Sequence, residues 1–222
     1  MQTVKYFGTD GIRGTYGNYP MTEEFMTRLG YAVGTVLGHD ADAINEQPIV
    51  MIGRDTRQSG PSLQQALTRG LTATGAIVWD LGILPTPGVA FLTQEHQATA
   101  GVVISASHNP AEQNGIKFFS RQGTKLSLEQ ELEIESILDD TALEDVPAMD
   151  ETKVFDRMDL QADYLRDLLA SQQGLNLNGK RILVDCSNGA AYRLAPRALE
   201  VLGADVVPIN IDSSGDTINK NA

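Results

Sequence analysis

The chain has 222 residues, of which 41% are hydrophobic and 21% charged, so a packed core is expected and wholesale disorder is excluded. The net charge of −12 argues against a general nucleic-acid binder, which needs a basic surface. A single cysteine, Cys186, excludes an internal disulfide framework, and no segment resembles a signal peptide or reaches the ~20 apolar residues of a membrane span. We therefore expect a soluble, cytoplasmic α/β protein that binds neither nucleic acid nor membranes.

Charge is spread unevenly along the chain. The first 125 residues are close to charge balance, and the acidic surplus gathers between Glu129 and Asp167. Such a run usually forms a solvated helix face or a connector. The first 125 residues are therefore the part of the chain in which an anionic ligand meets the least electrostatic opposition.

The amino-terminal part predicts alternating helices and strands. Apolar residues recur at helical spacing over residues 22–37, where Thr22 can cap the helix. A later helix is expected to begin with a capping box formed by Ser62 and Gln65 and to end at Gly75. Further helices are expected at residues 86–95 and 128–138, and strands at residues 49–52, 76–79, 101–105 and 116–119.

A strand–loop–helix–glycine–strand pattern occurs twice. The first copy runs from a strand that ends near Asp55 to Gly75, and the second from the strand 181–185 through the helix 193–202 to Gly203 and the strand 206–211. Two such units imply two α/β domains of related plan. We expect a first domain at residues 1–155 and the start of a second at residues 156–222, with an exposed connector at 142–152 and a helix at 160–170.

The second unit is too short to cover its own apolar surface. Two strands do not make a self-sufficient sheet, so apolar strand edges and helix faces should remain exposed. We therefore expect copies of the chain to associate through this unit, for example as a homodimer, or to be trimmed by proteases near residues 142–152.

The first segment that could bind a ligand or take part in catalysis is Phe7-Gly8-Thr9-Asp10-Gly11-Ile12-Arg13-Gly14. Its glycines recur at every third position and leave room for close approach of a ligand. Arg13 is suited to grip a phosphate in a bidentate fashion. The segment matches neither a Walker A loop nor the dinucleotide fingerprint, and a plain glycine-rich turn remains the alternative.

The second segment is Ser105-Ala106-Ser107-His108-Asn109-Pro110, directly after an expected strand. Ligands of open α/β sheets bind outside the carboxyl ends of strands, so a serine there can act as a nucleophile. The alternatives are a serine–asparagine turn without chemistry and a hydrolase triad, although the G-x-S-x-G elbow is absent.

The third segment, residues 114–119, places Lys117 in an apolar strand. Partial desolvation there would lower the pKa of the lysine and let it move protons; a strand-edge lysine pointing to solvent is the alternative. Phe118 and Phe119 are expected in the core. A serine, cations suited to phosphate and an acid/base group together fit phosphoryl transfer better than acyl transfer.

These three segments, in this order and spacing, resemble the α-D-phosphohexomutase superfamily, and the likeness runs from Lys5 to Asn221. The amino-acid sequence at residues 5–7 and 105–110 favours the bacterial branch that interconverts glucosamine 6-phosphate and glucosamine 1-phosphate over phosphomannomutase/phosphoglucomutase. The resemblance implies mixed-sheet α/β domains with helices on both faces, the first domain complete and the second incomplete. It also implies a cytoplasmic isomerase whose product feeds UDP-N-acetylglucosamine and peptidoglycan precursor synthesis.

The resemblance also implies roles for single residues. Ser107 would be the phosphoserine that passes its phosphoryl group through a 1,6-bisphosphate, and its phosphate would bind Mg²⁺. Lys117 and His108 would transfer protons, and Arg13 would hold the phosphate environment. Substrate and phosphate binding would fall to four residues, namely Thr9, Asp10, Gly11 and Asn109, the last of which would also shape the serine loop.

The chain departs from the superfamily pattern in what it does not contain. The Asp-Gly-Asp-Gly-Asp metal loop, the sugar-reading loop and the carboxyl-terminal phosphate-binding domain of the superfamily are absent from the sequence. We therefore expect this chain to be an amino-terminal portion of such an enzyme, whose small-molecule partner is a sugar phosphate and which shows no turnover on its own. A catalytically silent binding module of the same fold is a rival interpretation, and a dinucleotide-binding domain is disfavoured because no G-x-G-x-x-G turn follows a strand.

Overall fold

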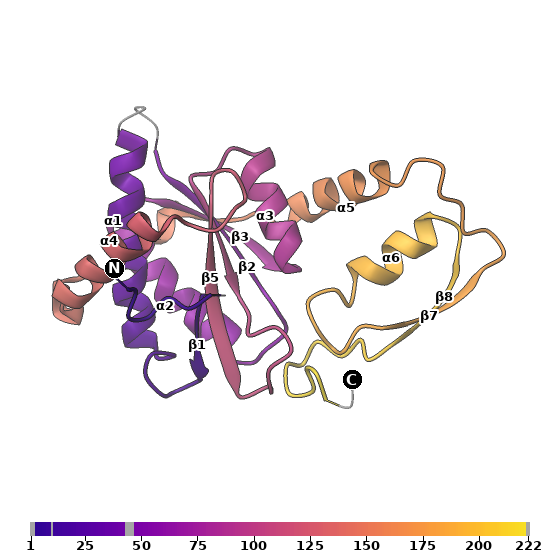
Figure 1. The fold of residues 1–222 in the computed structure, drawn as a ribbon, viewed down its shortest axis with the longest axis horizontal. Helices are drawn as coiled ribbons and strands as arrows, with labels where there is room; N and C mark the ends of the chain where they lie inside the picture. The colour runs from indigo at the N-terminus through magenta and orange to yellow at the C-terminus, as the bar shows by residue number, and fades with distance from the viewer. Residues whose placement is uncertain (1–2, 10, 43–46, 221–222) are drawn as a thin grey trace.

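The computed structural model describes residues 3–9, 11–42 and 47–220, which form a six-stranded mixed sheet followed by a smaller two-stranded unit (Figure 1). The strand order of the large sheet is β1-β5-β4-β2-β3-β6. Its strands are β1 (Ile12–Thr15), β2 (Ile49–Arg54), β3 (Ile77–Ile83), β4 (Ala100–Ile104), β5 (Gln113–Ser120) and β6 (Val154–Asp156). Strands β4, β2, β3 and β6 are parallel, whereas β5 is antiparallel to both of its neighbours, β1 and β4.

Helices cover both faces of this sheet, as expected. Alternate residues of β2 face opposite layers: Val50 and Ile52 pack with α1, α2 and α4, and Met51 packs with α3. The helices are α1 (Glu23–Asp42), α2 (Gly60–Ala73), α3 (Thr86–Glu95), α4 (Leu128–Asp140), α5 (Gln161–Ala170) and α6 (Leu194–Val201). Phe118 and Phe119 are both buried, one on each face of β5, which confirms that they belong to the core.

Helix capping was predicted correctly at one helix and wrongly at another. The Thr22 hydroxyl accepts a hydrogen bond from the Phe25 backbone N–H at 3.2 Å, as expected. The Ser62–Gln65 capping box is wrong, because α2 already begins at Gly60 and the Ser62 hydroxyl donates to Glu23 instead. A capping box is formed at α4, where Ser127 and Gln130 exchange hydrogen bonds.

Two short strands and part of the connector differ from expectation. The glycine-rich segment does not remain a turn throughout, because its second half forms β1 beside β5. The connector at residues 142–152 is only partly exposed. Val146 is buried, its carbonyl accepts a hydrogen bond from Arg69, and the Asp150 N–H bonds the hydroxyl of Thr72. The chain then enters β6, which extends the sheet beside β3.

The second unit repeats the order predicted from the sequence. Strand β7 (Arg181–Asp185) pairs in parallel with β8 (Asp205–Ile209), and α6 lies between them in the chain. Gly75 and Gly203 end the corresponding helices with φ of +97° and +100°. Leu183 and Val201 are exposed, as expected for an apolar surface that this unit does not cover; association through that surface stays a prediction. Across the described ranges, none of the helices has the length and apolarity needed to cross a membrane.

Candidate functional site

The serine loop, residues 105–110, follows β4 at the edge where β2 and β4 both end. Arg54 and Ile104 are in register at these strand ends, so residues that follow β2 lie beside the loop. Ala106 is fully buried, whereas Ser107 is exposed and has a φ of +56°. Residues other than glycine rarely adopt this backbone conformation, and it persists only where the surroundings enforce it.

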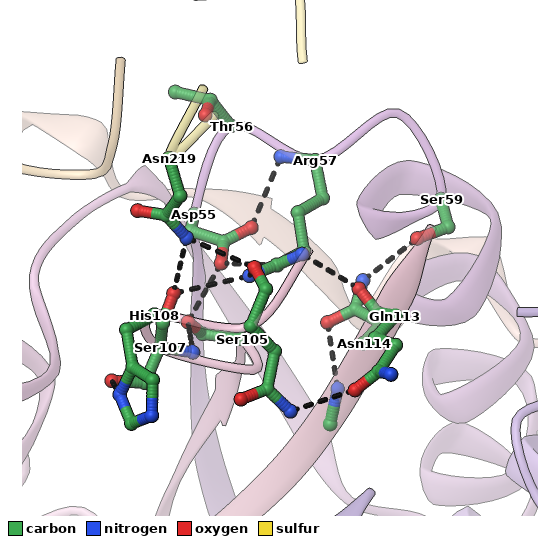
Figure 2. Close-up of polar contacts among 12 residues, drawn as sticks. Asp55, Thr56, Arg57, Ser59, Ser105, Ser107, His108, Gln113, Asn114 and Asn219 are labelled. Carbon is green, nitrogen blue, oxygen red and sulfur yellow. Dashed lines mark hydrogen bonds and ion pairs between the residues drawn. The ribbon is translucent and has the colours of Figure 1, made fainter. Parts of the chain in front are cut away.

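Arg57 supplies much of that enforcement from inside the protein (Figure 2). Its side chain is fully buried, and its guanidinium donates to main-chain carbonyls of the serine loop and the start of β5. Nη2 donates to the carbonyls of Ser107 at 3.0 Å and Asn109 at 2.9 Å. Nη1 donates to the carbonyls of Gln113 at 2.8 Å and Pro110. The planar fork of one arginine thus fixes the path of the loop.

Asp55 completes this support by bonding both the arginine and the loop. Its Oδ2 accepts from Arg57 Nε at 2.9 Å and from the Ser105 hydroxyl at 2.7 Å, while Oδ1 accepts from the Arg57 backbone N–H at 3.0 Å. The Ser105 hydroxyl in turn accepts from the Ser107 N–H at 3.0 Å. The buried charges of Asp55 and Arg57 are therefore paired and hydrogen-bonded, as burial of charge requires.

The four residues expected to be catalytic line one cavity. Arg13, Ser107, His108 and Lys117 surround a space of about 310 Å³, together with Thr86, Val103 and Ser105. Lys117 lies on β5 between β1 and β4, so it is an interior strand residue and not a strand-edge one. The Ser107 hydroxyl lies 3.4 Å from His108 Nδ1. The cationic side chains of Arg13 and Lys117 thus line the same cavity as the serine from two strands, β1 and β5, an arrangement suited to an anionic group.

The residues expected to bind substrate are placed differently from one another. Gly11 has a φ of +89°, and a Cβ there would lie 2.1 Å from the Ile116 carbonyl oxygen, so only glycine permits the contact with β5. Thr9 is exposed in the turn closed by the Gly8–Gly11 hydrogen bond and does not line the cavity. Asp10 lies outside the described residues.

Asn109 makes its hydrogen bonds within and beneath the serine loop and does not line the cavity. Its side-chain amide donates to Gln113 Oε1 at 2.7 Å, its N–H donates to the Ala106 carbonyl, and its own carbonyl accepts from Arg57. A role for its side chain in direct binding of phosphate stays a prediction.

A buried carboxylate binds the backbone where the glycine-rich segment begins. Glu135 on α4 is 6% exposed and accepts backbone N–H groups of Lys5 at 2.7 Å, Tyr6 at 2.6 Å and Phe7 at 2.9 Å. The Lys5 ammonium and the Tyr6 hydroxyl bond Asp139 one turn later, and these bonds hold the pKa of Asp139 below its ordinary value. The path that leads to β1 and Arg13 is therefore anchored to α4.

Sequence reasoning missed Arg57, Asp55 and Asn219 as site residues. The available signal was the polar run Gly-Arg-Asp-Thr-Arg after an expected strand, at the edge where ligands of α/β sheets bind. Nothing in the sequence connects Asn219 with the serine loop, which it contacts across 112 residues of chain.

Known proteins match both the sequence and the fold. Residues 4–145 match the family model phosphoglucomutase/phosphomannomutase, alpha/beta/alpha domain I. The phosphoglucosamine mutase of Alcanivorax borkumensis is 47% identical over 220 residues, which cover 99% of this chain and 48% of that protein. That of Polynucleobacter asymbioticus is 49% identical over 216 residues, or 97% of this chain and 48% of that protein.

A solved structure agrees with this result. A phosphoglucomutase/phosphomannomutase family protein from Burkholderia thailandensis has a TM-score of 0.76 at 26% identity, covering 96% of this chain and 45% of that chain. The chain spans about half the length of the curated relatives it matches.

Proposed function

The chain belongs to the phosphoglucomutase/phosphomannomutase family, and on that basis we propose that Ser107 carries the phosphoryl group in the interconversion of glucosamine 6-phosphate and glucosamine 1-phosphate. The observation that carries the proposal is the cavity that Ser107 shares with Arg13, His108 and Lys117. A phosphoserine adds roughly −1.5 to −2 charges at pH 7. Cations on the walls of the cavity would offset that charge through charge-assisted hydrogen bonds.

The reaction divides into two transfers through the same serine. The 1-hydroxyl oxygen of glucosamine 6-phosphate attacks the phosphorus of phosphoserine 107, the bond from phosphorus to Oγ breaks, and Lys117 or His108 takes the hydroxyl proton. The resulting 1,6-bisphosphate then turns over in the site, Ser107 Oγ attacks the phosphorus of its 6-phosphate, and the bond from that phosphorus to O6 breaks. O6 takes up the proton removed in the first transfer, and glucosamine 1-phosphate leaves. Such transfers depend mostly on positioning and charge stabilisation, which the fixed loop and the cationic walls would supply.

Mg²⁺ is the cofactor that the family resemblance implies, and the described residues do not form a complete site for it. Within them, no group of three or more His, Cys, Asp or Glu side chains is arranged to hold a metal ion. Asp55 lies beneath the serine loop, but both of its oxygens already accept hydrogen bonds from Arg57 or Ser105. The one ligand that we assign to this chain is a phosphate oxygen on Ser107, and no step is derived through the ion.

The preference for the amino sugar follows the names of the relatives, both of which are phosphoglucosamine mutases. The matched family model favours phosphoglucomutase or phosphomannomutase activity as the rival. An enzyme of the relatives' full length that contains this chain should therefore be assayed separately with glucosamine, glucose and mannose 6-phosphates. A higher kcat/KM for the glucosamine compound supports the proposal, and a higher kcat/KM for either other sugar supports the rival.

Phosphopeptide mapping tests the central role of Ser107. The chain is purified with phosphatase inhibitors, incubated with a hexose 1,6-bisphosphate and Mg²⁺, and its intact mass and phosphopeptides are measured. We expect one phosphate on Ser107, none in the Ser107→Ala variant, and an unchanged result in Ser120→Ala at the far end of β5. Phosphate on another residue, or none after this incubation, would contradict the proposal.

A further inference from the structure

A loop of the second unit lies on the serine loop. In this docking loop, residues 212–219, Asn219 Nδ2 donates to the carbonyl of Ser107 at 2.8 Å and to that of Asn109 at 3.0 Å (Figure 2). These are the same two oxygens that accept from Arg57 Nη2. Each carbonyl oxygen has two lone pairs, so both donors can be accommodated at once.

The docking loop is seated on the segment that carries Arg57. The Thr56 hydroxyl donates to the carbonyl of Asn188 at 2.5 Å. Gly215 is buried with a φ of +88°, and a Cβ there would lie 2.4 Å from the Thr56 carbonyl oxygen. Only glycine permits this approach. The second unit therefore contacts both the serine loop and the residues beneath it.

The docking loop also has its own internal support. Asn188 Nδ2 donates to the Thr217 carbonyl at 2.9 Å, and Asn188 Oδ1 accepts from the Asp212 N–H at 2.8 Å. The Asp212 carboxylate accepts the N–H and the hydroxyl of Ser214 and the hydroxyl of Thr217. These bonds hold the pKa of Asp212 below its ordinary value, and together they fix the shape of the loop.

We propose that Asn219 is a positioning residue, which holds Ser107 in its positive-φ conformation from the second unit while Arg57 holds it from the first. The inference rests on the proposed role of Ser107 as phosphoryl carrier. Arg57 follows β2 in the first unit, whereas Asn219 lies in the docking loop of the second. Of the two contacts, the one made by Asn219 therefore depends on the seating of the second unit.

Substitution of Asn219 in the 222-residue chain tests this. Asn219→Ala removes both hydrogen bonds to the serine loop, and Asn219→Gly does so while tolerating the φ of +59° at this position. Asn210→Ala is the matched control, because Asn210 also has a positive φ, 50°, and donates its side-chain amide to Asp185, away from the serine loop. The readouts are amide exchange at residues 107, 109 and 113 and the three-bond HN–Hα coupling of Ser107, which reports its φ.

We expect both Asn219 variants to speed amide exchange in the serine loop by about tenfold and to change the Ser107 coupling, while Asn210→Ala leaves both at the wild-type value. Asn219 variants that behave like Asn210→Ala would overturn the inference. If Asn219→Ala does not fold, Asn219→Gly decides between these outcomes.

A second readout separates this inference from the proposed function. Phosphate transfer from Ser107 to glucosamine 6-phosphate is followed in the wild type and in the same variants. If the Asn219 variants lose both phosphate transfer and the order of the serine loop, the result supports the carrier role of Ser107 and the positioning role of Asn219. If the loop loosens but transfer continues unchanged, the positioning role of Asn219 is overturned and the carrier role of Ser107 is not. A wild type that never carries phosphate on Ser107, with a loop that loosens as expected, refutes the proposed function and leaves the conformational role of Asn219 standing.

Discussion

Replacement of Arg57 by methionine should destabilise the chain far more than loss of an arginine nearby. The substitution keeps an unbranched apolar side chain of similar length but removes every hydrogen bond that the guanidinium makes. Asp55 would be left almost fully buried, at 3% exposure, without its ion-pair partner at 2.9 Å. The carbonyls of Ser107 and Asn109 would lose the hydrogen bonds from Arg57 and keep those that Asn219 donates.

The magnitude follows from the buried charge. Removal of one partner of a buried ion pair costs about 3–5 kcal/mol. Asp55 would retain hydrogen bonds from the Arg57 backbone N–H and the Ser105 hydroxyl, so the lower end, about 3 kcal/mol, is expected. For a protein of this size, that loss lowers Tm by about 6–12 °C.

Urea denaturation followed by the fluorescence of Trp79, the single tryptophan, measures the effect. Arg54→Met is the control, because Arg54 lies at the end of β2 and its Nε donates to the Gln64 side chain at 3.2 Å. Arg54→Met should lower the free energy of unfolding by no more than about 1 kcal/mol. Addition of Asp55→Asn to Arg57→Met should recover part of the loss, since the stranded charge is then gone. If Arg57→Met lies within ~1 kcal/mol of Arg54→Met, the support assigned to Arg57 is wrong.

Two further predictions concern the anchor on α4. Glu135→Gln should lower the free energy of unfolding by about 1–3 kcal/mol and speed amide exchange at residues 5–7, because the charged acceptor of three N–H groups is lost. The exposed neighbour Glu133 provides the control as Glu133→Gln, and equal exchange in the two variants would refute the anchor. The pKa of Asp139 lies below its ordinary 3.8, first because of the Tyr6 hydroxyl and then because of the Lys5 ammonium. Its stabilising effect is therefore present above that value and is lost as the pH falls through the lowered pKa. Asp139→Asn should lower Tm at pH 7 and approach the wild type in strong acid; a difference in Tm that stays constant with pH would contradict this.

The interior of the fold was predictable because burial leaves a pattern in the sequence. Strand β4 is buried at every residue and the helix 86–95 was predicted with its observed bounds. Strands β1 and β6 were missed because edge strands need little apolar sequence. In β1, Ile12 alone is buried, and β6 is three residues long with no buried residue. Their pairing with β5 and β3 defines them, and pairing is a long-range property.

The candidate site likewise contains residues that the sequence suggests and residues that only the structure reveals. Arg13, Ser107, His108 and Lys117, which line one cavity, could be proposed from the sequence because their chemistry resides in the side chain and in the residues of a local motif. Arg57 and Asn219 were missed because they bind main-chain carbonyls, which every residue possesses and which therefore leave no trace in residue type. Their partners lie about 50 and 110 residues away in the chain.

Support through main-chain atoms suits the chemistry proposed for Ser107. A phosphoryl carrier has to accept and release a large charge at one oxygen without a change in the shape of its loop. Arg57 and Asn219 bind the Ser107 carbonyl, and Ser105 accepts its N–H, so none of these bonds involves Oγ. Phosphorylation at Oγ therefore breaks none of them, and the loop presents the same geometry before and after transfer, which avoids reorganisation at the moment of reaction. Because one of the two carbonyl donors belongs to the second unit, any shift in the seating of the docking loop acts on Ser107 without contact to the sugar.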